Sequence, residues 1–302
     1  MTVGIGLSVY SGLGPATVPY LDAAAAAFDS LWFPDHLQSN RTGGVMEGWT
    51  LLAHALARYP DKTCGHQVLC NEFRHPAVLA KMAATAQILS AGRFVLGIGA
   101  GWHREEAEAY GLDFPPTPER IARMDESIEL LRLLWTGGSV DHAGRFFSLR
   151  GAECAPAPEP VPPVMVGGSG ERHLLAVVAR QADLWNYIYR DVEAFAGKLR
   201  VLHRHCDDVG RAPSAIVPVL GVQILIGSSE REIRRMVENG GARSVEQNGI
   251  AGDPRRALDQ LLAGIDAGAR AIVVGFADSP RTDGTELFVQ EVMPGLRLAG
   301  LS

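Results

Sequence analysis

Eight short runs of apolar, often β-branched residues alternate with longer helix-like stretches along almost the whole chain. This alternation constrains the fold more than any other feature, because it is the pattern of βα units around a parallel sheet. Eight such units in 302 residues favour a (β/α)8 TIM barrel, which typically needs about 250 residues. The expected strands are Val3–Val9, Ser30–Phe33, Lys62–Leu69, Arg93–Ile98, Val164–Val166, Asp183–Asn186, Val217–Ile226 and Ala271–Val274.

The helices expected between these strands also follow from periodicity and from their first residues. Pro118–Trp135 carries apolar residues at helical spacing, and Pro76 stands where proline suits the first turn of a helix. Val140–Leu149 instead contains two strand-like pieces around a glycine turn, which predicts an inserted β-hairpin. With this hairpin and extended loops, residues 1–302 are expected to form a single domain. The other expected helices are Pro15–Phe28, Trp49–Arg58, His103–Tyr110, Glu171–Arg180, Val192–Val209, Glu230–Glu238, Pro254–Ala267 and Glu286–Leu298.

An open, doubly wound sheet that binds a dinucleotide is the alternative fold. The run Gly97–Gly101 follows an expected strand, as the glycine fingerprint of that fold requires. However, the position of the third glycine is occupied by Trp102, so the fingerprint is absent.

Composition excludes several classes of partner. Hydrophobic residues make up 47% and charged residues 21%, values close to those of ordinary globular domains. The net charge is −6 and the basic residues are dispersed, which argues against nucleic acid and favours a small molecule. No apolar run approaches 18 residues and the N-terminus lacks a charged signal-peptide region, so we expect no membrane association and a cytoplasmic location.

Motifs for metal, phosphoryl-transfer and hydrolase chemistry are missing. Four cysteines are scattered without a C-x-x-C pair, so neither a zinc site nor a disulfide framework is indicated. The glycine segment Gly167–Gly170 is not followed by Lys-Ser/Thr, and no G-x-S-x-G or H-E-x-x-H occurs. We therefore expect no metal centre.

In a barrel, polar residues directly after the strands are the candidates for chemistry. Asp35 and His36 follow the second strand, where a carboxylate can orient an imidazole, although such a pair is also common as a loop contact. Gly101 and Trp102 follow the fourth strand, and they fit either a ligand wall or a turn beside a core tryptophan. Gly167–Gly170 precedes an expected helix, whose free N–H groups suit a phosphate, or it is a plain connection.

Four segments in order, Leu31–His36, Arg74–Ala77, Ser90–Trp102 and Pro162–Gly168, resemble the luciferase-like flavin and deazaflavin monooxygenase and oxidoreductase superfamily. Ala182–Asn186 and the C-terminal part match as well, so the resemblance covers essentially the whole chain. The form of the glycine motif, with Asp-His after the second strand, is more similar to the branch that uses the deazaflavin coenzyme F420.

The resemblance implies a barrel with a flavin or deazaflavin lying across the strand ends. It places Gln67-Val68 at a bulge behind the central ring, often with a non-proline cis peptide, and assigns the cofactor phosphate to Gly167, Gly168 and Ser169. It also implies a homodimer formed by helices of the early half of the barrel. The full set of cofactor-binding residues that it suggests is Ser8, Gln67, Val68, Asn71, Gly101, Trp102, Gly167, Gly168, Ser169 and Trp185.

The expected reaction is hydride transfer between C5 of coenzyme F420 and a small organic substrate, with His36 exchanging a proton and Asp35 positioning it. One alternative is an FMN-dependent two-component monooxygenase. Another is a non-enzymatic homologue, and only this one is disfavoured by the retained Asp35, His36 and Gly167-Gly168. The glucose-6-phosphate dehydrogenases of the superfamily have a glutamate where this chain has Trp102. Together with Tyr187 and Tyr189, this difference suggests an apolar or aromatic substrate.

Overall fold

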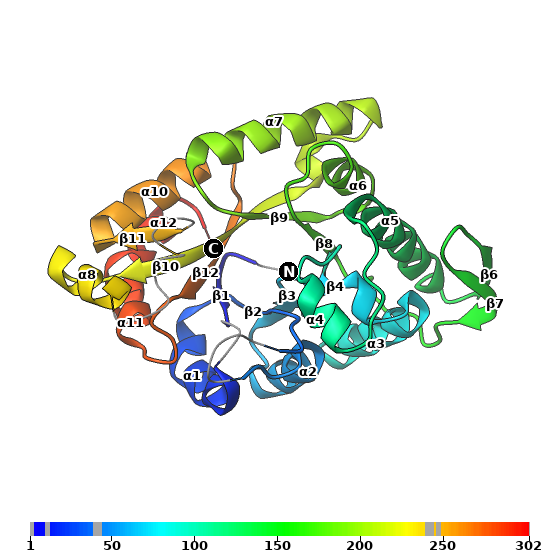
Figure 1. The fold of residues 1–302 in the computed structure, drawn as a ribbon, viewed down its shortest axis with the longest axis horizontal. Helices are drawn as coiled ribbons and strands as arrows, with labels where there is room; N and C mark the ends of the chain where they lie inside the picture. Colours follow the sequence, from blue (N-terminus) through cyan, green and yellow to red (C-terminus); the bar gives the residue numbers. More distant parts are fainter. Residues whose placement is uncertain (1–2, 10–12, 39–43, 239–244, 246–248, 302) are drawn as a thin grey trace.

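A closed ring of eight parallel strands forms the centre of the molecule, and Figure 1 shows most of the helices arranged around it. The computed structural model describes residues 3–9, 13–38, 44–238, 245 and 249–301. Each ring strand pairs with the next in chain order, and the last pairs with the first, so the expected (β/α)8 barrel is confirmed. The ring strands are β1 (Ile5–Ser8), β2 (Ser30–Phe33), β3 (Thr63–His66), β5 (Phe94–Gly99), β8 (Val164–Gly167), β9 (Leu184–Ile188), β10 (Val217–Ile226) and β12 (Ala271–Phe276).

The helices differ from expectation mainly where the chain has irregular turns. The expected helix Pro15–Phe28 is regular only in its middle, with a single 3-10 turn on either side. The expected helix Glu286–Leu298 is two helices, because Pro294 lacks an N–H group and starts a new first turn. No described helix is long and apolar enough to cross a membrane. The helices are α1 (Thr17–Ala24), α2 (Gly48–Arg58), α3 (Pro76–Leu89), α4 (Arg104–Ala109), α5 (Thr117–Leu134), α6 (Leu174–Gln181), α7 (Val192–Asp208), α8 (Glu230–Glu238), α10 (Pro254–Asp266), α11 (Asp283–Glu291) and α12 (Met293–Leu298).

The interior of the barrel is packed around one tryptophan. The Trp32 ring is completely buried, and glycines leave the room for it: a Cβ at Gly6 would lie 2.6 Å from its Nε1, and one at Gly65 2.6 Å from its Cζ3. The indole N–H donates to Ser30 at 2.9 Å, which satisfies the only polar atom of the ring. Val68 packs against the buried cluster that contains Trp32. The open mouth of the barrel therefore lies on the opposite side of Val68 from Trp32.

Two short strands were not expected. The strand predicted over Lys62–Leu69 ends at His66, and after the cis peptide Gln67–Val68 the chain adds β4 (Leu69–Cys70) alongside β5. The second is β11 (Ile250–Gly252), which pairs with β10 outside the ring. The interruption after His66 turns the chain at the mouth of the barrel.

The predicted hairpin is present as β6 (Ser139–Ala143) and β7 (Ser148–Glu153), an antiparallel pair that stands at the edge of the molecule in Figure 1. A carboxylate of α5 holds its turn: Glu126 accepts the backbone N–H groups of Phe146 at 3.0 Å and Phe147 at 2.9 Å. The hairpin therefore packs on the outside of the barrel and does not enter its mouth.

Candidate active site

A cavity of about 310 Å³ opens at the carboxyl ends of β2, β3, β5, β8 and β9, where barrel enzymes place their active sites. The loops after these strands supply its walls. Pro34–His36 follow β2, Gln67–Cys70 follow β3, and Gly99–His103 end β5 and follow it. The strand-end positions that the sequence singled out are thus brought together in one place.

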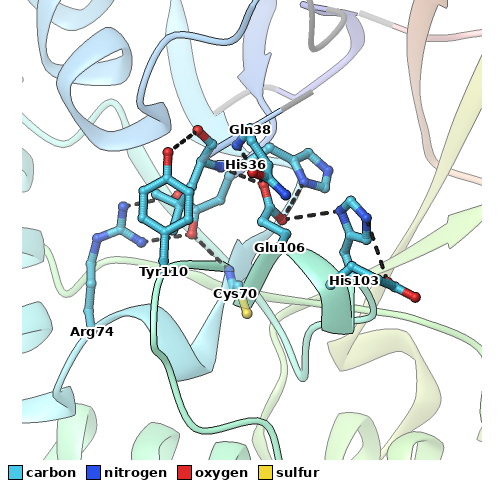
Figure 2. Close-up of polar contacts among 10 residues, drawn as sticks. His36, Gln38, Cys70, Arg74, His103, Glu106 and Tyr110 are labelled. Atoms are coloured by element: carbon cyan, nitrogen blue, oxygen red, sulfur yellow. Dashed lines mark hydrogen bonds and ion pairs between the residues drawn. The ribbon is translucent and has the colours of Figure 1, made fainter. Parts of the chain in front are cut away.

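One wall of the cavity carries two imidazoles and a buried carboxylate. Glu106, on α4, is 1% exposed, and its Oε2 lies 3.0 Å from His36 Nδ1 and 3.6 Å from His103 Nδ1. Figure 2 shows this carboxylate between the two rings. Burial opposes ionisation of Glu106, but the backbone N–H groups of Gln38 and Leu37 and the His36 ring outweigh it and lower the pKa of this carboxyl.

Trp102 closes the same wall from the solvent side. Its ring stacks on His103 with centroids 4.8 Å apart and meets His36 edge to face at 5.7 Å. The side chain is 73% exposed and still lines the cavity, so a bound ligand would cover it. This is the position where the sequence predicted a wall of a ligand pocket.

Asp35 does not do what the sequence suggested. Its carboxylate is buried and accepts both guanidinium nitrogens of Arg74, at 2.7 and 2.9 Å, and the backbone N–H of Cys70 at 2.9 Å. Within the described part of the chain it has no hydrogen bond to His36, whose partner is Glu106. The expectation that Asp35 orients His36 is therefore corrected: adjacent side chains diverge, and Asp35 fixes the loop after β3.

Val68 forms the floor of the cavity, directly after the predicted cis peptide bond Gln67–Val68, which the structure confirms. Its methyl groups fit between two glycines. A Cβ on Gly99 would lie 2.7 Å from Val68 Cγ2, and one on Gly167 would lie 2.9 Å from Val68 Cγ1. This apolar floor with bare backbone on both sides fits the flat face of a ring system.

The glycine segment after β8 is built differently from the expected phosphate site. The helix expected from Glu171 begins only at Leu174, and Gly168 N–H donates to Asn186 O at 3.1 Å instead of being free. The described hydrogen bonds leave the N–H of Ser169 unused. Gly168 therefore shapes the cavity wall, whereas Ser169, next to it, does not line the described cavity and has an N–H group without a partner among the described residues.

The aromatic residues of β9 point away from the cavity. Trp185 is fully buried against Phe195, and its indole N–H donates to Gly168 O at 2.8 Å. Tyr187 shares this outward face and is buried, whereas Asn186 and Ile188 line the cavity. Trp185 is thus a support of the Gly168 wall and not a direct ligand contact, and Tyr187 does not define the substrate pocket.

Ser8, Asn71 and Tyr189 also lie outside the cavity wall. Ser8 ends β1 with 9% of its surface exposed, and Asn71 donates to Glu72 at 3.2 Å in the turn after β4. Tyr189 is 2% exposed in the outer core. Their predicted part in cofactor or substrate binding is not supported by where these side chains lie.

The sequence does not single out Glu106, which lies within the helix expected over His103–Tyr110. The residue stands about 70 positions from His36, so no local pattern reports the contact. The available signal was a pair of acidic residues at the start of a short helix directly after the glycine motif. The ligand atoms of His36, His103 and Glu106 lie within 4.8 Å of one another, but the 3.0 Å contact is that of a hydrogen bond.

Comparisons with known proteins concern the family and the overall fold of the chain. A family model described as luciferase-like monooxygenase matches residues 20–270. A phthiodiolone/phenolphthiodiolone dimycocerosates ketoreductase from Mycobacterium sp. (strain JLS) is 32% identical over 246 residues, which are 73% of this chain and 63% of the relative. An F420-dependent glucose-6-phosphate dehydrogenase from Nocardia farcinica is 28% identical and covers 89% of this chain and 90% of its own.

A solved structure of an F420-dependent secondary alcohol dehydrogenase, in complex with an F420-acetone adduct, superposes with a TM-score of 0.84. It covers 98% of this chain and 100% of its own at 17% identity, so this likeness concerns the fold. The matched stretch spans less than two thirds of the Mycobacterium ketoreductase.

Proposed function

Because the chain belongs to the luciferase-like monooxygenase family, we propose that it is a coenzyme F420-dependent oxidoreductase that transfers a hydride between the cofactor and a small organic substrate. The observation that carries the proposal is the cavity, where a flat apolar floor at Val68 faces the His36 wall. Relatives named for F420-dependent dehydrogenation and for ketone reduction support the same reaction class.

The residues present fit a deazaflavin. Val68 and the bare backbone of Gly99, Gly101 and Gly167 would hold the flat ring system, and the Ser169 N–H would be available to an anionic group. When bound, the deazaflavin supplies the hydride chemistry. His36, with Nδ1 held by Glu106, would exchange a proton with the substrate oxygen at its other ring nitrogen, Nε2.

The substrate we infer is neutral and apolar or aromatic. Phe73, Trp102, Phe114 and Ile188 line the cavity, and no lysine or arginine is among the described residues of its wall. A sugar phosphate would therefore lack a cation for its phosphate. A ketone or secondary alcohol with an apolar body fits this lining better.

Titration of the purified protein with coenzyme F420 and separately with FMN, followed by fluorescence quenching, tests the proposal. We expect saturable binding of F420 and much weaker binding of FMN. Tight FMN binding without F420 binding would instead favour a two-component monooxygenase and would overturn the proposed function.

We also infer a homodimer that uses the early helices of the barrel. Helix α3 exposes Val78 and Leu89, at 57% and 82%, and the two are 11 residues apart, so they lie on one face. Light scattering should give about twice the 32.4 kDa of one chain, and Leu89→Asp should shift it toward the monomer. Leu298→Asp, on the exposed face of α12, is the matched control. A mass of one chain for the wild type at micromolar concentration contradicts the dimer.

Two further proposals concern organisation and location. We infer that residues 1–302 act as one domain, since the last ring strand closes directly on the first. We also infer a reducing compartment such as the cytoplasm. The four cysteines all lie in the described part of the chain, and all are buried and free.

A further inference from the structure

We propose that Glu106 is the positioning residue of His36 and fixes the tautomer in which Nε2 is an acceptor directed to the substrate. This inference rests on the proposed function only for its consequence in catalysis. The hydrogen bonds that carry it are independent of any cofactor.

Glu106 is held in place by the loop that it orients. Its Oε1 accepts the backbone N–H groups of Leu37 at 2.6 Å and Gln38 at 2.9 Å, directly after His36 in the chain. Tyr110, which directly follows α4, donates a hydrogen bond from its hydroxyl to Leu37 O at 2.8 Å. Figure 2 shows these bonds converging on the loop after β2. The carboxylate therefore has one oxygen committed to the backbone and one left for His36.

The charge of Glu106 decides where the proton of His36 resides. An ionised carboxylate only accepts hydrogen bonds, so Nδ1 of His36, 3.0 Å from Oε2, must carry a hydrogen. In the neutral ring Nε2 then carries the lone pair. His103 faces the same oxygen from 3.6 Å, beyond hydrogen-bond distance, so His36 is the preferred partner.

The substitution Glu106→Gln should move the ring hydrogen of His36 from one nitrogen to the other with little change in the shape of the side chain at position 106. In Glu106→Gln the amide oxygen must stay with the two backbone N–H groups, because only an acceptor fits there. The amide NH2 then faces His36 Nδ1 and donates to it, which moves the ring hydrogen to Nε2. At the substrate, Nε2 of His36 would then be a neutral hydrogen-bond donor instead of a base.

Long-range ¹H–¹⁵N NMR correlation of the histidine rings tests the tautomer directly. Spectra are recorded at about pH 8.5, which is about two units above the usual pKa of a histidine side chain. The His36 signals are assigned by their loss in His36→Ala. We expect protonated Nδ1 in the wild type and protonated Nε2 in Glu106→Gln. The matched control is Glu105→Gln, the same change at the neighbouring, 79% exposed side chain, and it should keep the wild-type tautomer.

Catalysis supplies the second readout. Single-turnover hydride transfer should fall by about 10²–10⁴-fold in Glu106→Gln, the range of general acid–base catalysis, while F420 affinity stays close to that of the wild type. Glu105→Gln should match the wild type in both measurements.

The outcomes separate the two proposals. Protonated Nε2 in the wild type, or an unchanged tautomer in Glu106→Gln, overturns the role of Glu106, and the wild-type spectrum suffices even where the variant fails to fold. A metal ion on Nδ1 would displace its hydrogen, so an Nδ1–H signal that emerges only after treatment with a chelator also overturns it. An inverted tautomer with an undiminished rate supports the role of Glu106 and contradicts proton transfer by His36.

Discussion

Asp35 is tied into a buried ion pair, and its removal should weaken the fold more than the chemistry. Asp35→Ala leaves the Arg74 guanidinium and the Cys70 N–H without their shared partner. Breaking a buried pair in this way costs about 3–5 kcal/mol, and the contact of Arg74 with Glu47 places the loss toward the lower value.

Urea unfolding of Asp35→Ala measures this loss. The control is Asp22→Ala, which removes an equally bidentate but exposed pair with Arg58 and should change stability little. Equal losses in the two variants would show that burial of the Asp35 pair is not what stabilises the loop.

His36 is the residue whose loss should stop turnover without loosening the cofactor. The His36 ring forms one wall and Val68 the floor, so His36→Ala should leave the floor intact. Hydride transfer at saturating F420 should fall by about 10²–10⁴-fold. A single-turnover rate within about threefold of the wild type is far below that range and would remove His36 from the mechanism.

Which residues reach the cavity could be predicted from the chain only in part. The sequence indicates Asp35 and His36 because both follow a strand, but their separate partners, Arg74 and Glu106, lie far away in sequence. On β9 the alternation of residues is visible in the sequence. In a parallel barrel both faces of a strand are buried, so the alternation does not tell which face meets the axis. The resemblance therefore suggests Trp185 as a cofactor contact, although its ring packs against Phe195 in the outer core.

The connection between β8 and α6 depends on a backbone conformation that only glycine adopts easily. Gly168 has φ +130°, and a Cβ there would lie 2.9 Å from Leu174 Cδ1. Gly168→Ala should therefore cost about 1–3 kcal/mol of stability and weaken F420 binding through the displaced wall.

Gly170→Ala is the matched control for this connection. It places a methyl group on an exposed residue, 3.6 Å from Leu174 Cβ, which is an ordinary contact. Thermal unfolding and F420 titration of both variants check the prediction. An equal effect of the two substitutions would mean that the special conformation of Gly168 is not what maintains the cavity.

For the whole molecule, the eightfold alternation was sufficient to predict the barrel, because a parallel ring needs helical crossovers between successive strands. It could not predict the turn after His66 or the strand β11, since each involves only a few residues without a periodic signal. It also could not show that Gly6 and Gly65 exist to seat Trp32. Such packing depends on side chains from several strands at once.

His66 makes the stability of the whole barrel depend on pH. The ring is completely buried, stacked on Trp49 with centroids 5.3 Å apart, and neither ring nitrogen has a hydrogen-bond partner among the described residues. Burial, together with the positive charge of Arg74, lowers the pKa of His66 to about 3.

Below about pH 6.5 the unfolded chain therefore binds a proton on His66 that the folded chain does not bind. Stability falls as the pH drops from there toward 3. At about 1.4 kcal/mol per pH unit, His66 should cost about 2 kcal/mol between pH 7.5 and 5. His66→Leu removes this dependence, whereas the other titrating groups remain in both proteins. Urea unfolding at the two pH values should thus show a fall about 2 kcal/mol steeper for the wild type than for His66→Leu, whatever their absolute stabilities. An equal fall in the free energy of unfolding of the two proteins would mean that the folded barrel accepts a proton on His66. That result would contradict the enclosure of this ring between β3 and α2.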